Sequence, residues 1–322
     1  MKELLLLFPF PPSNKFKPML CNLITLLGVT ATGKTRLAVK LATGFNGEII
    51  SADSRQVYKR MNIGTGKDLN DYNLNGAKVQ YHLIDIVEPE EEFNLFEFKR
   101  RFLEAFNSII NRKKLPFLVG GTGLYLSSIL QNYELKEADF SSMRAAELKA
   151  LSMVELKDIL LSKESAVHNT TDLLDKDRLV KAILIAEAKN NPVQKVPEIH
   201  SLVLGLKMER EEIKKRITAR LKKRLDEGMI EEVKDLIASG LSFDKLNFFG
   251  LEYRYLGLYL KGEINFDEMF SKLNIAIHDF AKRQMTWFSK MEREGIKIHW
   301  IEEPYFNNAK EVIKKRLNGS YS

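Results

Sequence analysis

The stretch "LLGVTATGKTRLAVKLA", residues 26–42, joins an apolar run to a pattern with the periodicity of a helix. Gly28 is followed by four residues and then by Gly33, Lys34 and Thr35. Glycines at these positions let the backbone curl so that successive N–H groups point inward, and the helix that follows adds positive potential. The spacing therefore predicts a phosphate-binding loop, in which Lys34 reaches between phosphates and the Thr35 hydroxyl ligates Mg²⁺.

Strand patterns and helix patterns alternate around this loop. The strand patterns lie at residues 22–30, 48–51, 79–87 and 115–119, and helix patterns separate them. This order predicts an α/β fold of the P-loop NTPase type, a doubly wound parallel sheet with helices on both faces. The loops after Leu27, Ser51 and Val119 then meet at the carboxyl edge of the sheet, where the sites of such folds lie.

The chain is expected to have four parts. Residues 22–132 form the first part of the core, and residues 133–175, which have few strand formers, form a small helical insertion. Residues 176–322 complete the core and continue in a mostly helical, basic part. Residues 1–21 are expected to be an extension, or the true start is Met19, because their apolar block is too short and too interrupted by prolines to span a membrane.

The bulk composition limits the possible sites and partners. The 322-residue chain has one cysteine, Cys21, so it forms no intramolecular disulfide and no all-cysteine metal site, which suits a cytoplasmic protein. Its net charge of +7 weakly favours a polyanionic partner. Nothing in the sequence demands more than a monomer.

Asp53 follows a strand pattern at the predicted carboxyl edge. A carboxylate there could ligate Mg²⁺, orient water or accept a proton. The alternative is that Asp53 caps a helix that begins near Arg55. Ser54, Arg55 and Gln56 add a hydroxyl, a cation and an amide, a mixture that suits recognition of a polar base.

The turn "GGTG" surrounds Thr122 with Gly120, Gly121 and Gly123. Such a turn between a strand and a helix could offer N–H groups and a hydroxyl to a developing negative charge. The alternative is a tight turn that binds no ligand.

Two basic segments stand in the second half of the chain. In the first, Arg216, Arg220 and Arg224 recur every four residues beside an apolar stripe, an arrangement that suits phosphate contacts or simply a solvated helix face. The second, "FAKRQMTWF" at residues 280–288, combines cations and aromatic residues. This combination suits RNA, although the aromatic residues could equally belong to the core.

Together, "GVTATGKT", "SADSRQVY", "GGTGLYL" and "AKRQMTWF", with "MNIGTGKD", resemble the tRNA dimethylallyltransferase family, the isopentenyltransferases that prenylate tRNA. The resemblance runs from about Asn22 to about Trp300. Adenylate dimethylallyltransferases share the P-loop, but the helical insertion and the basic second half favour the tRNA enzymes.

The resemblance implies transfer of a dimethylallyl group from dimethylallyl diphosphate to N6 of the adenosine 3′ to the anticodon (position 37), in tRNAs that read codons beginning with U. Asp53 would be the general base, and Thr122 and Arg220 would stabilise the leaving diphosphate. The diphosphate would be held with Mg²⁺ by residues of the P-loop: Gly28, Thr30, Ala31, Thr32, Gly33, Lys34 and Thr35.

The same resemblance implies contacts with the anticodon stem-loop of tRNA. These would come from the loop after Asp53, from the insertion and its flank, and from the second basic segment. The residues are Ser54, Arg55, Gln56, Arg144, Arg178, Lys181, Lys282 and Arg283.

The sequence departs from the family pattern at four places. Val29 replaces a common proline, and His278-Asp279 stands where Thr-Arg is frequent. "FGLEY" (residues 249–253) replaces "IGYKE", and "KAIL" (residues 181–184) replaces "RALE". A cysteine- and histidine-rich finger does not follow Trp300, which indicates a bacterial type.

Two other functions compete with this interpretation. A P-loop small-molecule kinase or NTPase would explain the phosphate loop and Asp53, but it leaves the basic second half unexplained. A non-catalytic RNA-binding protein on a degenerate P-loop fold is disfavoured by the intact Gly33, Lys34, Thr35 and Asp53.

Overall fold

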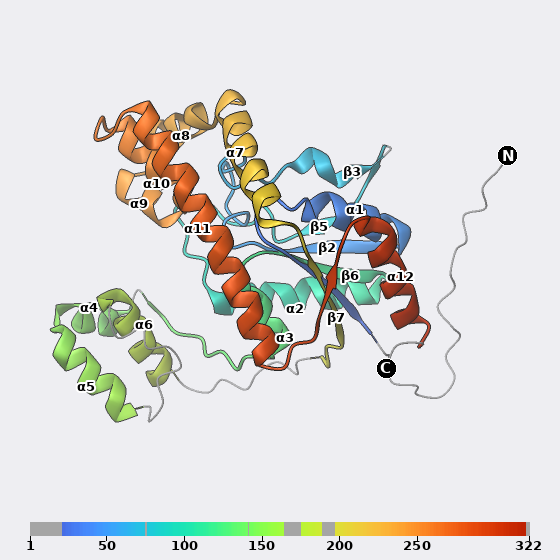
Figure 1. Ribbon diagram of the computed structural model, residues 1–322. Helices are drawn as coiled ribbons and strands as arrows, with labels where there is room; N and C mark the ends of the chain where they lie inside the picture. Colours follow the sequence, from blue (N-terminus) through green and yellow to red (C-terminus); the bar gives the residue numbers. More distant parts are fainter. Residues whose placement is uncertain (1–20, 75, 141, 164–174, 189–196, 320–322) are drawn as a thin grey trace. The chain divides into compact units, whose positions relative to one another are not determined.

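The computed structural model describes residues 21–74, 76–140, 142–163, 175–188 and 197–319 (Figure 1). The expected extension at residues 1–21 therefore lies, except for Cys21, outside the described residues. The chain divides into two compact units. One, the core, runs to Asn132 and resumes at Glu198, and the other, the insertion, spans Tyr133–Pro197.

Six parallel strands form the sheet of the core. They are β1 (Leu23–Leu27), β2 (Gly47–Ala52), β5 (Tyr81–His82), β6 (Leu115–Gly120), β7 (Ser201–Leu206) and β8 (Ile298–Ile301). Their order is β5-β2-β6-β1-β7-β8, and β1 is central, with Ile24 opposite Phe117 of β6 and Leu202 of β7. A separate antiparallel hairpin consists of β3 (Asn73–Leu74) and β4 (Ala77–Lys78).

Helices cover both faces of this sheet. On one face α1 (Lys34–Gly44) and α12 (Tyr305–Leu317) contact each other and share an apolar cluster with alternate strand residues such as Leu26 and Val119. On the other face α2 (Leu95–Asn111) packs against β2 and β6 and contacts α3 (Gly123–Leu130). The alternating side chains of the strands thus fill both layers, and the predicted doubly wound α/β fold is confirmed.

The rest of the core is helical, with one short 3₁₀ turn, η1 (Leu69–Tyr72). The helices are α7 (Arg210–Asp226), α8 (Met229–Ala238), α9 (Phe243–Phe248), α10 (Leu251–Leu260) and α11 (Phe266–Arg293). The last is the longest helix of the described chain and packs against α3, α7 and α10 (Figure 1). A capping box starts it, because Asn265 and Glu268 each accept the other's backbone N–H.

The insertion contains α4 (Met143–Ala150), α5 (Met153–Lys163) and α6 (Lys176–Glu187). Its unit extends beyond the expected boundary at Asp175 and includes α6. The physical reason is the apolar face of α6, on which Leu179 and Ile183 pack with Leu148 and Leu156 of the two preceding helices.

Two strands differ from expectation. The pattern at residues 79–87 gives only the two-residue β5, because Leu83 and Asp85 adopt positive φ angles of 63° and 56° that break the extended run. β8 was not predicted. It is a four-residue strand after a long helix, and its pairing with β7 comes from the tertiary fold.

Among the described residues, we find no helix with the length and apolar character required to span a membrane.

At the amino edge of the sheet, a buried carboxylate binds three basic side chains. Glu48, 2% exposed at the start of β2, binds Arg112 at 2.6 Å, His82 at 2.7 Å and Lys114 at 3.0 Å. Burial alone would raise the pKa of Glu48, but the hydrogen bonds from these three partners outweigh it and lower the pKa to about 2.

We expect Glu48→Gln to lower the free energy of unfolding at pH 7 by about 2 kcal/mol, because it leaves these partners without their anion. The folded pKa of Glu48 lies below the unfolded value of 4.5, so its contribution is present above pH 4.5 and is lost as the pH falls towards 2. Urea unfolding should therefore show a smaller difference between wild type and variant at pH 3 than at pH 7.

A matched control is Glu302→Gln, which removes an exposed ion pair with Lys207. It should change the free energy of unfolding by less than about 0.5 kcal/mol. An equal effect of Glu48→Gln at both pH values would contradict the linkage.

Candidate active site

The P-loop wraps the N-terminus of α1. Ala31 and Gly33 have positive φ angles of 66° and 81°, and the Thr32 hydroxyl donates to the carbonyl of Val29 at 2.8 Å. A Cβ on Gly28 would lie 3.1 Å from the Thr32 hydroxyl, so this position has little room for a side chain. Among the described residues no side chain caps α1, so its first N–H groups are suited to an anion.

Lys34 is the cation of this loop. Its Nζ donates to the Val29 carbonyl at 2.7 Å. Burial, followed by the charge of the nearby Arg220, lowers the pKa of Lys34 to about 7, although Asp53 opposes the shift. An ammonium held in this way would be stabilised by a phosphate, which supplies the missing negative charge.

Asp53 lies in the turn that follows β2. Its Oδ1 accepts the backbone N–H of Arg55 at 2.9 Å, and residues 54–57 form turns. No helix begins at this point of the described chain, so the alternative role of Asp53 as a helix cap is wrong. The carboxylate is half-buried and close enough to influence the pKa of Lys34.

Thr122 connects the loop after β6 to the loop after β2. Its backbone N–H donates to the carbonyl of Ala52 at 3.3 Å, and its hydroxyl accepts the N–H of Ser54 at 3.2 Å. A Cβ on Gly120 would collide with the backbone of Ala52, which explains the glycine. The Thr122 side chain therefore lies beside the Asp53 turn.

Arg220 comes to the site from α7. Its guanidinium donates to the Thr30 hydroxyl of the P-loop. Burial, followed by the charge of Arg224 one turn later, lowers the pKa of Arg220 to about 10. The structure thus brings Arg220 to the P-loop, next to the loops of Asp53 and Thr122.

The three arginines of α7 have different surroundings. Arg216 is exposed and pairs with Glu212 at 2.6 Å, so the alternative of a solvated helix face holds for it. Arg224 is buried, with Nη2 3.8 Å from Asp68.

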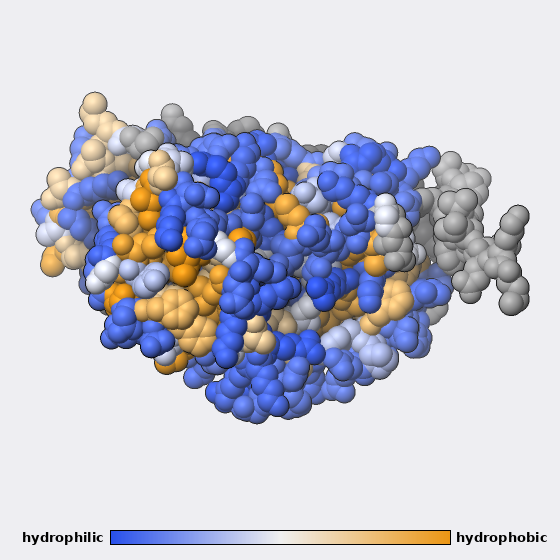
Figure 2. All heavy atoms as spheres, turned by 90° about the horizontal axis from the view of Figure 1, so that it is seen from above, coloured by the Kyte–Doolittle hydropathy of each residue, from blue (hydrophilic) through white to orange (hydrophobic). Residues whose placement is uncertain are grey.

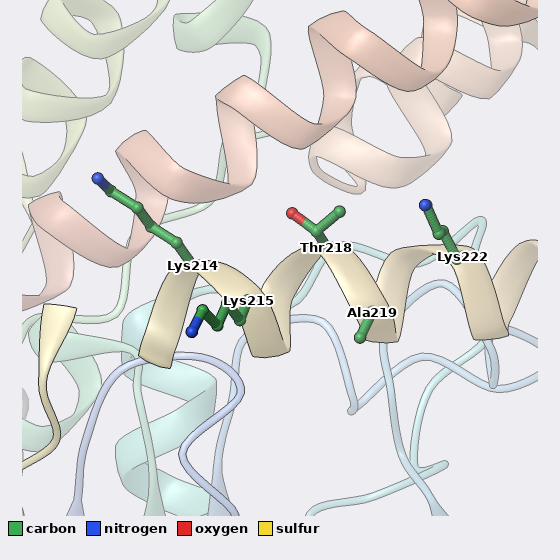
Figure 3. A pocket seen from close by; sticks show the side chains of 5 residues that line it. All are labelled: Lys214, Lys215, Thr218, Ala219 and Lys222. Atoms are coloured by element: carbon green, nitrogen blue, oxygen red, sulfur yellow. The ribbon is translucent and has the colours of Figure 1, made fainter. Parts of the chain in front are cut away.

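A basic groove lies along α7 (Figure 3). Lys214, Lys215, Thr218, Ala219 and Lys222 line it. Thr218 points towards α11 and donates to Asn274 at 3.0 Å. Seen from above, the molecule presents mostly hydrophilic side chains, with hydrophobic ones gathered in patches between them (Figure 2).

The residues after Asp53 are held in different ways. Arg55 lies over the Phe248 ring, 4.8 Å from its centroid, and burial lowers the pKa of Arg55. The Gln56 amide is used inside the protein, since it accepts from the Ser51 hydroxyl at 3.0 Å and donates to the Gly66 carbonyl at 3.1 Å.

The other predicted tRNA contacts lie on three helices. Arg144 of α4 pairs with Glu187 at 3.0 Å. On α6, the backbone N–H of Arg178 donates to the Asp175 carboxylate. The Nζ of Lys181 lies 5.5 Å from the centroid of the Phe140 ring. On α11, Lys282 and Arg283 are exposed.

The expected Mg²⁺ depends on few protein ligands. The described residues contain no group of three or more His, Cys, Asp or Glu side chains placed to hold a metal. The Thr35 hydroxyl in the first turn of α1 and the nearby Asp53 carboxylate are hard oxygen donors. This donor set fits Mg²⁺, which commonly takes one or two protein oxygens and completes its coordination with substrate phosphates and water.

Sequence reasoning missed the internal role of Gln284, which it grouped with the RNA-facing residues. Gln284 is 7% exposed, accepts from the Thr30 N–H at 2.8 Å and donates to the Gly121 carbonyl at 2.9 Å. The signal was present: Ile277, Ala281, Gln284 and Phe288 follow the apolar period of a buried helix face.

The loop "MNIGTGKD", residues 61–68, is also held by residues that the sequence did not reveal. Glu232 of α8 accepts the N–H groups of Asn62 and Ile63, both at 2.7 Å, and of Gly64 at 3.0 Å. The buried Lys67 donates to the Tyr58 carbonyl at 2.6 Å.

Comparison with known proteins shows the family of this chain. The family profile described as IPP transferase matches residues 56–291, and another, described as isopentenyl transferase, matches residues 21–88. A protein of Syntrophus aciditrophicus named tRNA dimethylallyltransferase 1 is 50% identical over 305 residues, which are 93% of this chain and 99% of that protein. The chain belongs to the tRNA dimethylallyltransferase family.

Other tRNA dimethylallyltransferases agree. That of Geotalea daltonii is 53% identical over 285 residues, 88% of this chain and 92% of the relative. The crystal structure of a full-length tRNA isopentenylpyrophosphate transferase from Bacillus halodurans matches with a TM-score of 0.67 and 30% identity, covering 93% of this chain and 97% of that one. The family resemblance predicted from the motifs is confirmed.

The position of Arg220 generates a prediction about anion binding. We expect Arg220→Gln to weaken the binding of inorganic pyrophosphate about 10- to 100-fold, because it removes a desolvated cation from the P-loop. Isothermal titration calorimetry measures this loss. Arg216→Gln, on the same helix but at the surface, should leave the affinity within about twofold of wild type. Equal losses in the two variants would contradict a local role for Arg220.

Proposed function

We propose that this protein transfers the dimethylallyl group of dimethylallyl diphosphate to N6 of adenosine 37, next to the anticodon, in tRNAs that read codons beginning with U. The product is N6-dimethylallyladenosine. The observation that carries the proposal is the convergence of a carboxylate, Asp53, with two cations at the phosphate loop, Lys34 of the loop itself and Arg220 of α7. Family membership supports the choice of substrates.

Lys34 and Arg220 stabilise the leaving diphosphate. In the reaction the bond between C1 of the dimethylallyl group and the diphosphate oxygen breaks, and negative charge builds up on that oxygen. Lys34 and Arg220 lie where they can neutralise this charge, and the half-buried surroundings strengthen their effect. Thr122, whose hydroxyl accepts the Ser54 N–H, would donate its own hydroxyl proton to the leaving oxygen of the diphosphate.

Mg²⁺, held by Thr35 with Asp53 nearby, would supply further positive charge to the diphosphate. Gly28, Thr30, Ala31, Thr32 and Gly33 would enclose its phosphates through the curved backbone of the loop.

Asp53 acts on the nucleophile, the adenine N6, as a general base. The lone pair of the adenine N6 is delocalised into the ring, so N6 attacks C1 effectively only if a proton leaves as the new bond forms. Asp53 accepts that proton. Its Oδ1 is held in place by the N–H of Arg55, within the turn that follows β2. A base stacked within the anticodon loop cannot reach this position, and the adenosine must therefore be extruded.

Contacts to the anticodon stem-loop would come from Ser54 and Arg55 beside the target base, and from the exposed Lys282 and Arg283. Arg144, Arg178 and Lys181 of the insertion would add contacts to the backbone. The Gln56 amide would act through the loop it supports, because both of its ends are engaged inside the protein.

The test is incubation of the protein with dimethylallyl diphosphate, Mg²⁺ and an unmodified tRNA with adenosines at positions 36, 37 and 38. Mass spectrometry of the nucleosides should show N6-dimethylallyladenosine, and a transcript with guanosine at position 37 should give none. Absence of product from folded protein, with ATP turnover in the absence of the prenyl donor, would instead support a kinase or NTPase.

Asp53→Asn separates chemistry from binding. Asparagine can still accept the Arg55 N–H, so the turn is retained, but it cannot take a proton. We expect the single-turnover rate to fall about 100-fold or more and the tRNA dissociation constant to stay within about twofold. Asp71→Asn, which alters a carboxylate paired with Arg36, is the control and should retain the rate. A parallel loss of rate and affinity in Asp53→Asn would show a binding role.

A further inference from the structure

Gln284 is the polar member of a buried helix face. The other buried residues of α11 are apolar: Met269, Leu273, Ile277, Ala281, Phe288 and Met291. A glutamine in such a stripe loses its hydration, and this cost is offset only if both ends of the amide find partners.

Both ends of the Gln284 amide are engaged by the active-site loops. Oε1 accepts the N–H of Thr30, in the P-loop after β1, at 2.8 Å. Nε2 donates to the carbonyl of Gly121, in the turn after β6, at 2.9 Å. A Cβ on Gly121 would collide with this Nε2, so the glycine is what admits the amide. One side chain thus joins two loops from neighbouring strands.

The two joined residues contact the groups assigned to the reaction. The Thr30 hydroxyl accepts from Arg220. Thr122, next to Gly121, accepts the N–H of Ser54, the residue after Asp53. Hydrogen bonds, joined by covalent links within Thr30 and between Gly121 and Thr122, therefore connect Arg220 through Gln284 to the turn that holds Asp53.

We propose that Gln284 is a positioning residue that sets the separation between the diphosphate-binding loop and the Thr122–Asp53 side of the site. The inference rests on the proposed function. Displacement at C1 requires the attacking N6, the carbon and the leaving oxygen to be in line, and a misplacement of about 1 Å can cost about 100-fold in rate. A device that fixes the two loops relative to each other acts on this alignment.

The amide is the group that this task requires. It offers a donor and an acceptor side by side, one for each loop. A carboxylate would keep the acceptor for Thr30 but would face the Gly121 carbonyl without a proton, and a thioether would provide neither bond.

The experiment compares Gln284→Met and Gln284→Glu with wild type and with Asn274→Leu. The control removes a hydrogen bond between α11 and Thr218 of α7 and leaves the active-site loops untouched. For both Gln284 variants we expect kcat to fall about 10- to 100-fold, with KM for tRNA within about twofold and a melting temperature close to that of the control. Asn274→Leu should keep the wild-type kcat.

Hydrogen exchange supplies a readout that does not depend on catalysis. In Gln284→Met, the amides of residues 28–33 and 120–122 should exchange at least about tenfold faster than in Asn274→Leu. Unchanged exchange at both loops, or an activity loss in Asn274→Leu as large as in the Gln284 variants, would overturn the proposal. Wild-type protein that forms no prenylated nucleoside would overturn the proposed function, whereas the exchange result would still decide whether Gln284 fixes the loops.

Discussion

The central constraint of this structure is the placement of two cations against one small loop. Burial lowers the pKa of both Lys34 and Arg220, and a neighbouring guanidinium adds to each shift: that of Arg220 for Lys34, and that of Arg224 for Arg220. The two cations come from opposite halves of the chain and are brought together by the fold. A parallel sheet delivers the P-loop at its carboxyl edge, and α7 reaches over that edge with the guanidinium. The site is thereby prepared for a strongly anionic ligand before one arrives.

Much of this could be predicted from the sequence, because the signals are local. The P-loop, the Asp53 turn and the Thr122 turn each lie within a few residues of a strand, and strand–helix alternation fixes where strands end. The role of Arg220 was predicted from the family resemblance, because helical periodicity alone could not distinguish Arg220 from the exposed Arg216.

What escaped prediction depends on long-range pairing. Gln284 and Glu232 each bind backbone groups far away in the chain, and no pattern near them names those partners. β8 has only four residues, too few for a clear strand pattern. α6 packs into the insertion through an apolar face, and its sequence pattern is the same as that of a helix that packs on the core. The loop at residues 61–68 was recognised as a motif, but its support by Lys67 from within and Glu232 from outside required the fold.

The bond between Gln284 and Thr30 also has a consequence for biosynthesis. The two residues are 254 positions apart, so the P-loop of a growing chain leaves the ribosome long before α11 is translated. The guanidinium of Arg220 becomes available earlier, with α7, but until α11 is made the loop lacks the amide of Gln284. A chain that is truncated or stalled before α11 therefore cannot assemble the complete phosphate site, and the competence of the site is tied to the synthesis of this late helix.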